Sequence, residues 1–172
     1  ARVKEITESG VLGTAQSIHV TYPEEARTRP GSDSDALFQA VDLCCWLADA
    51  TPAEAHRQDD GAVRITFADG RSAEILAQIS SNAWNVVITG TNATLTGLLR
   101  SGPGQLTLNW PERSKTITIP ETDPLQSELT YYVGAIIREE SWLISSLADT
   151  QNSLLAYEMA QNAATDARFL RG

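Results

Sequence analysis

Apolar and polar residues alternate with a period of two over several stretches of the chain, and this pattern predicts strands. Between residues 15 and 22 the apolar set is Ile18, Val20 and Tyr22, and the polar set is Ser17, His19 and Thr21. Residues 63–67 and 73–79 alternate on either side of Ala68-Asp69-Gly70, which is typical of a hairpin turn. Alternation over 84–90, 95–99, 106–110 and 117–119 predicts an antiparallel meander, with a turn at 111–114.

A period close to 3.6 residues marks four helices. We expect the first over residues 2–9, ended by Gly10, and the second over 35–48, after a loop at 23–34 and a capping box of Ser32 and Asp35. The third opens at Asp123-Pro124, and the fourth runs from near Asp149 to about Phe169. The apolar stripe of the third helix is Leu125, Leu129, Val133 and Ile136, and we interpret the neighbouring Tyr131 and Tyr132 as core residues.

These elements predict an α+β fold with one largely antiparallel open sheet of about six strands and helices packed on one face. A length of 172 residues fits one domain spanning residues 1–172. The second face of such a sheet is free to meet a partner. We therefore expect a homodimer through the open face, with Ser17, His19 and Thr21 at the interface.

Composition narrows the choice of partner and compartment. A formal net charge of -9 without a stripe of Lys or Arg argues against a nucleic-acid partner. No apolar run approaches the roughly 20 residues of a membrane span. The adjacent Cys44 and Cys45 offer no disulfide framework and suit a reducing, cytoplasmic compartment, where we interpret them as core residues.

Neither histidine has a second ligand at a metal spacing, so the sequence predicts no metal site. The first, His19, lies on the polar face of the expected strand and is interpreted as solvated or at a subunit contact. The second, His56, precedes Arg57 and the Asp59-Asp60 pair, and we expect it to be exposed at a turn.

Several local strings resemble the C-terminal domain of the glucose-fructose oxidoreductase and inositol dehydrogenase family (Gfo/Idh/MocA), in the order in which that domain has them. They are Glu-Ser-Gly-Val-Leu-Gly at 8–13, a helix with Asp35, Gln39, Asp42-Leu43 and Trp46-Leu47, Ile65 to Ala73, and Ile88 to Ala93. The resemblance covers nearly the whole chain. It implies the substrate-side and subunit-contact domain of an NAD(P)-dependent sugar or polyol oxidoreductase.

In that family an N-terminal Rossmann domain binds NAD or NADP, and its lysine acts together with an Asp and a His of the helix. This chain has no Gly-x-Gly-x-x-Gly, and Gly102-Pro103-Gly104 lies between strands, so we expect no nucleotide site within it. The Rossmann domain would lie upstream or on another chain. Gln39 stands where the family has its histidine, and an amide cannot act as a general acid or base. The catalytic residues are therefore unknown.

Asp35, Gln39, Asp42 and Trp46 follow one another at helical spacing, which places three polar groups on one stripe. Asp35 and Gln39 are candidates for binding the hydroxyls of a sugar-like substrate. The alternative is that Asp35 belongs to the capping box and Gln39 is merely solvated. For Asp42 we favour a structural role, in which its carboxylate satisfies backbone groups near the helix.

Three classes of function remain open. In the first, the chain is the substrate-binding and subunit-contact part of an oxidoreductase and is inactive alone. In the second, it is a non-catalytic module that kept this fold and binds a ligand or a protein. In the third, it serves only as a dimerisation domain.

Overall fold

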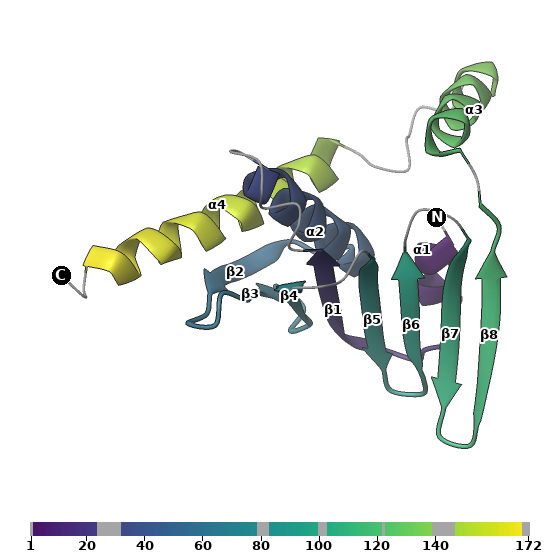
Figure 1. Ribbon diagram of the computed structural model, residues 1–172, viewed down its shortest axis with the longest axis horizontal. Coiled ribbons are helices and arrows are strands. Elements are labelled where there is room, and N and C mark those ends of the chain that lie inside the picture. The colour runs from purple at the N-terminus through teal and green to yellow at the C-terminus, as the bar shows by residue number, and fades with distance from the viewer. Residues whose placement is uncertain are drawn as a thin grey trace.

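The computed structural model describes residues 2–23, 32–78, 83–99, 103–121, 123–138 and 147–169. The helices are α1 (Arg2–Glu8), α2 (Ser32–Ala48), α3 (Pro124–Ile137) and α4 (Leu147–Phe169). The strands are β1 (Ala15–Pro23), β2 (Pro52–Arg57), β3 (Val63–Phe67), β4 (Ser72–Gln78), β5 (Trp84–Gly90), β6 (Thr94–Leu99), β7 (Gly104–Trp110) and β8 (Arg113–Ile119). The predicted helices and strands are all found, and the fold is α+β (Figure 1).

The described strands form one mixed sheet of eight in the order β2-β3-β4-β1-β5-β6-β7-β8, more than the six or so expected. The β1–β4 pair is parallel and every other pair is antiparallel. The strand that no alternation predicted is β2, whose polar sequence hides its pattern. It contains His56, which is half-buried and pairs with Arg64, so the prediction of an exposed turn histidine was wrong. Arg113 and Ser114, expected in a turn, belong to β8.

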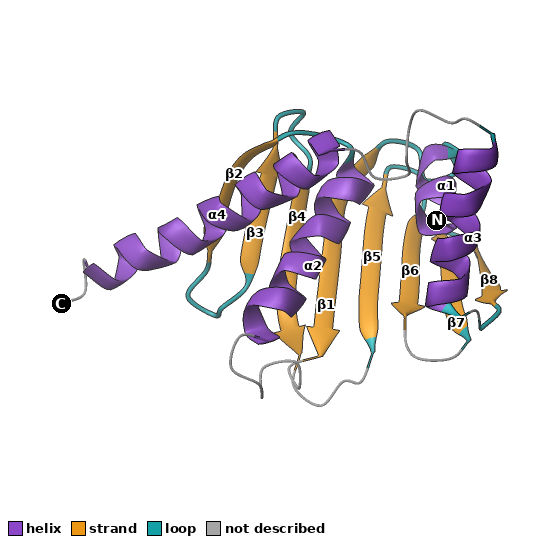
Figure 2. Ribbon diagram, turned by 90° about the horizontal axis from the view of Figure 1, so that it is seen from above, coloured by secondary structure: helices purple, strands orange, loops and turns teal. Residues whose placement is uncertain are grey.

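Three helices cover one face of the twisted sheet (Figure 2). Together α1, α2 and α4 enclose a core in which Val20, Ile65, Ile88 and Leu106 are fully buried. Both Cys44 and Cys45 are buried and free, which confirms their assignment to the core. No described helix lies against the opposite face, which is therefore the open face.

The remaining helix, α3, does not pack on the sheet, and here the sequence prediction was wrong. Figure 1 shows α3 beyond the end of β8, apart from the other three helices. Three residues of its predicted apolar stripe are exposed, Leu129 at 55%, Val133 at 53% and Ile136 at 75%, and the side chain of the fourth, Leu125, lies outside the described residues. Tyr132 is also exposed, so it is not a core residue, and Tyr131 is half-buried. An apolar stripe indicates that a helix needs a partner but does not say where the partner is.

The loop between α1 and β1 is anchored on the β5–β6 turn. The amide of Asn92 donates to the Leu12 carbonyl at 3.0 Å, and the amide of Thr91 donates to the Thr14 carbonyl at 3.0 Å. Gly90 permits this approach, because a Cβ atom there would lie 2.2 Å from the Leu12 carbonyl oxygen. Two of the strings that carry the family resemblance, 8–13 and 88–93, are thus in direct contact.

Candidate functional site

The polar stripe predicted on α2 divides into a solvent-exposed part and a part with structural contacts. Gln39 is exposed and free to meet a ligand. The side chain of Asp35 and its proposed capping box with Ser32 lie outside the described residues. The substrate-binding role of Asp35 and Gln39 thus stays a prediction, for which Gln39 has the required exposure.

Asp42 joins α2 to α4. The fully buried Ser153 of α4 has its hydroxyl 2.7 Å from Asp42 Oδ1 and 2.9 Å from the backbone carbonyl oxygen of Asp149, and it can donate to either. The role is structural as predicted, but the partner is a side-chain hydroxyl and not backbone. Burial raises the pKa of the adjacent Cys45 thiol to about 12, a hydrogen bond with Ser153 opposes that rise, and the charge of Asp42 adds to it. Cys45 is therefore a protonated packing residue and a poor nucleophile.

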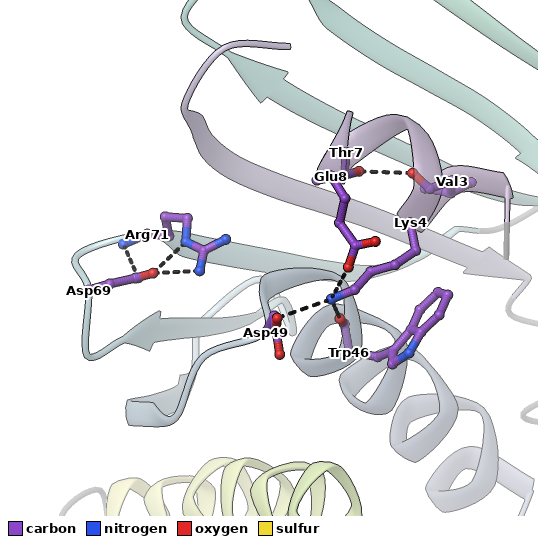
Figure 3. Close-up of polar contacts among 8 residues, drawn as sticks. All are labelled: Val3, Lys4, Thr7, Glu8, Trp46, Asp49, Asp69 and Arg71. Atoms are coloured by element: carbon purple, nitrogen blue, oxygen red, sulfur yellow. Dashed lines mark hydrogen bonds and ion pairs between the residues drawn. The ribbon is translucent and has the colours of Figure 1, made fainter. Parts of the chain in front are cut away.

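Trp46 lies in the last turn of α2, and its backbone carbonyl is bound by a lysine of α1 (Figure 3). Lys4 Nζ donates to the Trp46 carbonyl at 2.7 Å and lies 5.7 Å from the centre of its indole ring. The same ammonium is 3.6 Å from Glu8 Oε1 and 3.8 Å from Asp49 Oδ2. A cation on the last carbonyls of a helix is favourable because that end carries partial negative charge. The contact fixes α2, and with it Gln39, relative to the rest of the domain.

The open face presents Ser17, His19 and Thr21, the residues predicted to form a subunit contact. Ser17 and His19 are half-buried, whereas Thr21 is only 8% exposed and its Oγ1 has no hydrogen-bond partner among the described residues. Ser17 and His19 therefore offer the more accessible surface.

The strand register extends this polar surface from β3 to β8. One row runs through Arg64, Glu74, His19, Val87, Thr96, Thr107 and Thr116. Within it Arg64 Nη2 lies 3.7 Å from Glu74 Oε2, and the hydroxyls of Thr107 and Thr116 are 3.3 Å apart. Charged residues thus lie at the β3–β4 end of the row and threonines at the β6–β8 end. Sequence reasoning found only the β1 part of this surface, because the row depends on which strands are neighbours.

Among the described residues, no group of three or more His, Cys, Asp or Glu side chains is arranged to hold a metal ion. None of the helices in this part of the chain combines the length and apolarity needed to cross a membrane.

Comparison with known proteins supports the fold through structure and not through sequence. No family model and no curated protein matches the chain. Among solved structures, a UDP-N-acetylglucosamine 3-dehydrogenase from Acidithiobacillus ferrooxidans is similar with a TM-score of 0.73 and 14% identity, over 94% of this chain and 57% of that one.

Two further solved structures are similar in fold to this chain. An oxidoreductase from Agrobacterium radiobacter, in complex with NAD+, L-tartaric acid and magnesium, has a TM-score of 0.71 and 13% identity, over 96% of this chain and 59% of that one. A 3-ketoreductase from Actinomadura kijaniata, in complex with NADP and TDP-benzene, has a TM-score of 0.66 and 13% identity, over 94% of this chain and 57% of that one.

The chain has the fold of the larger part of these oxidoreductases. It spans less than two thirds of their length, and identity at this level shows a shared fold and nothing more specific. The resemblance to the Gfo/Idh/MocA family agrees with these matches at the level of fold.

Proposed function

We propose that this chain is the substrate-binding and subunit-contact domain of an NAD(P)-dependent oxidoreductase that acts on a sugar-like or polyol substrate. The nucleotide would be held by a segment upstream of residue 1 or by a separate chain. The domain would supply one wall of the substrate site and would not be active alone.

The observation that carries this proposal is how the chain matches the solved enzymes. Almost all of it overlays on 57–59% of each enzyme, and the complexes include NADP and NAD+. The sequence has no glycine fingerprint that could bring helix amides against a pyrophosphate. A division of labour, with the cofactor bound outside these 172 residues, accounts for both facts.

In this proposal Gln39 and Asp35 bind substrate hydroxyls and do not transfer protons. The amide of Gln39 can both donate and accept hydrogen bonds, and the carboxylate of Asp35 can accept them. Proton transfer would then require a base from the nucleotide-binding segment, and a lysine there is the candidate that the family resemblance suggests.

Nucleotide binding tests the proposal directly. We expect titration calorimetry to give no heat of binding for NADH or NADPH with the 172-residue chain, and saturable binding with the complete protein. Saturable micromolar binding to the chain alone would show that the cofactor site has been misplaced.

Steady-state kinetics of the complete protein test the substrate site. We expect Asp35→Ala and Gln39→Ala to raise KM, whereas Gln151→Ala, at an exposed position on α4, should leave it unchanged. If neither site variant alters KM or kcat, the two residues do not bind substrate.

A second candidate function, a non-catalytic ligand-binding or dimerisation module, is favoured by one observation. Gln39 occupies the position of the family's histidine. Gln39→His separates the two candidates, since a rise in kcat would show a site that still supports catalysis. Absence of turnover in both the complete protein and this variant would favour the module.

The open face is our proposed homodimer interface, which should bury more than about 1,000 Å² if the dimer is stable. Thr96 lies in its central row, so Thr96→Arg would place a charge within the contact. We expect sedimentation velocity to show a dimer for the unmodified chain, a monomer for Thr96→Arg and a dimer for the control Gln151→Arg. A monomer in all three would contradict the proposed interface.

A further inference from the structure

The most prominent surface that the proposed function leaves unused is the apolar stripe of α3. It consists of five exposed side chains: Leu129 (55%), Tyr132 (44%), Val133 (53%), Ile136 (75%) and Ile137 (75%). Their spacing of i, i+3, i+4, i+7 and i+8 places them on one face of the helix, and none of them is charged. Monomeric proteins seldom expose such a contiguous apolar patch. Where one is found, it usually marks a surface that binds a partner.

Local contacts alone do little to hold α3. The Gln126 amide donates to Asp123 Oδ1 at 3.3 Å as an N-cap, and the Thr130 hydroxyl donates to the Gln126 carbonyl at 2.7 Å. A helix of 14 residues is marginal in water without tertiary packing. The stripe therefore provides the contact that would stabilise α3 once a partner covers it.

The position of α3 limits what that partner can be. Strands β1, β4, β6 and β8 run in the same direction, so their C-terminal ends share one edge of the sheet. At that edge α3 follows β8, beyond the end of the sheet (Figure 1). At the same edge α2, which carries Gln39, follows β1 in the chain. A domain that binds to α3 would thus lie at the same edge of the sheet at which α2, with the proposed substrate-binding residue Gln39, begins.

We propose that the apolar stripe of α3 is the docking surface for the nucleotide-binding half of the oxidoreductase. This inference rests on the proposed function. The matched enzymes contain a further portion outside the shared fold, and that portion must contact this fold somewhere. The open face, with its rows of Ser, Thr and charged residues, suits a polar subunit contact, whereas a permanent contact within one enzyme is better served by an apolar surface.

Hydrogen exchange on α3 tests the proposal. In the complete protein we expect the amides of α3 to exchange at least about tenfold more slowly than in the 172-residue chain, because docking suppresses local opening. We expect Ile136→Glu to restore fast exchange, since it places a charge in the centre of the contact. Leu154→Glu, a matched change at a 48% exposed leucine of α4, should leave α3 protected.

Two controls keep the result interpretable. The melting temperature of the isolated chain should be the same with and without Ile136→Glu, because the side chain is exposed there, so a loss of protection cannot be ascribed to misfolding. NADPH and NADH binding by the complete protein is measured in parallel. If the nucleotide binds while α3 still exchanges fast, the docking inference is wrong and the proposed function stands.

The remaining outcomes separate the other possibilities. Protection of α3 that appears in the isolated chain and grows with its concentration would identify a second copy as the occupant and would overturn the inference. Protection in the complete protein without any nucleotide binding would show that some other part of the protein covers the stripe, and it would overturn both the inference and the proposed function.

Discussion

Substitution of Gly90 tests the contact between the two glycine-containing strings. In Gly90→Ala the new Cβ would lie 2.2 Å from the Leu12 carbonyl oxygen and 2.9 Å from the Leu12 Cβ, and real Cβ contacts essentially never fall below 3.0 Å. The α1–β1 loop must therefore move away by nearly an ångström. That displacement would break the hydrogen bonds from the amides of Thr91 and Asn92, each now 3.0 Å long. Two lost hydrogen bonds and the overpacking together should cost about 2–4 kcal/mol.

Urea denaturation followed by circular dichroism measures this cost, and the melting temperature should fall by about 5–15 °C. Gly61→Ala is the matched control, since Gly61 has a φ of 88° and no neighbour within 4 Å of the added Cβ. Its cost should be the strain of the left-handed conformation alone, about 1–2 kcal/mol. If Gly90→Ala is no more destabilising than Gly61→Ala, the loop and the turn do not support one another as described.

Three other changes probe the packing of the helices. We expect Lys4→Met to lower the free energy of unfolding by about 1–2 kcal/mol, because the C-terminal end of α2 loses a hydrogen bond from a charged group. Chemical denaturation measures this change, and an unchanged free energy of unfolding would mean that the contact is absent in solution. In a double-mutant cycle with Asp42→Ala and Ser153→Ala, the interaction energy should be about 1–3 kcal/mol, and a value near zero would mean that the two side chains do not interact. Burial raises the pKa of both the Cys44 and the Cys45 thiol in the folded chain. The protonated thiols therefore contribute their full stability below the unfolded thiol pKa near 8.5, and this contribution is lost as the pH rises toward the thiol pKa values of the folded state. Stability should thus fall by up to about 1.4 kcal/mol per pH unit per thiol in alkaline denaturation curves, and a Cys44→Ala, Cys45→Ala double variant with the same slope would contradict this assignment.

The candidate site could be predicted only in outline. The need of a buried carboxylate for partners indicated a structural role for Asp42, but its partner Ser153 lies on a helix 111 positions away, and no local pattern links the two. The polar alternation around His19 revealed one strip of the open face. The row from Arg64 to Thr116 required the strand order, because residues on separate strands become neighbours only through pairing.

The prediction for α3 was wrong for a related reason. Its stripe of apolar residues shows that one face must be buried, and this requirement is the same whether the cover comes from the chain itself or from another body. The sequence carries no signal for the direction in which α3 leaves β8. Only the tertiary structure shows that the stripe faces away from the core.

The sequence by itself determined most of the elements and the faces of the strands. Period-two alternation placed β1 and β3 to β8, Gly10 placed the end of α1, and Gly70 placed the turn after β3; both glycines have a positive φ in the structure. What only the tertiary structure decided is pairing: β1 between β4 and β5, the polar β2 on the edge, and the contact of the 8–13 and 88–93 strings. The physical reason is that periodicity records whether a side chain is buried, whereas pairing depends on long-range contacts between backbones whose hydrogen-bonding groups are the same in every strand.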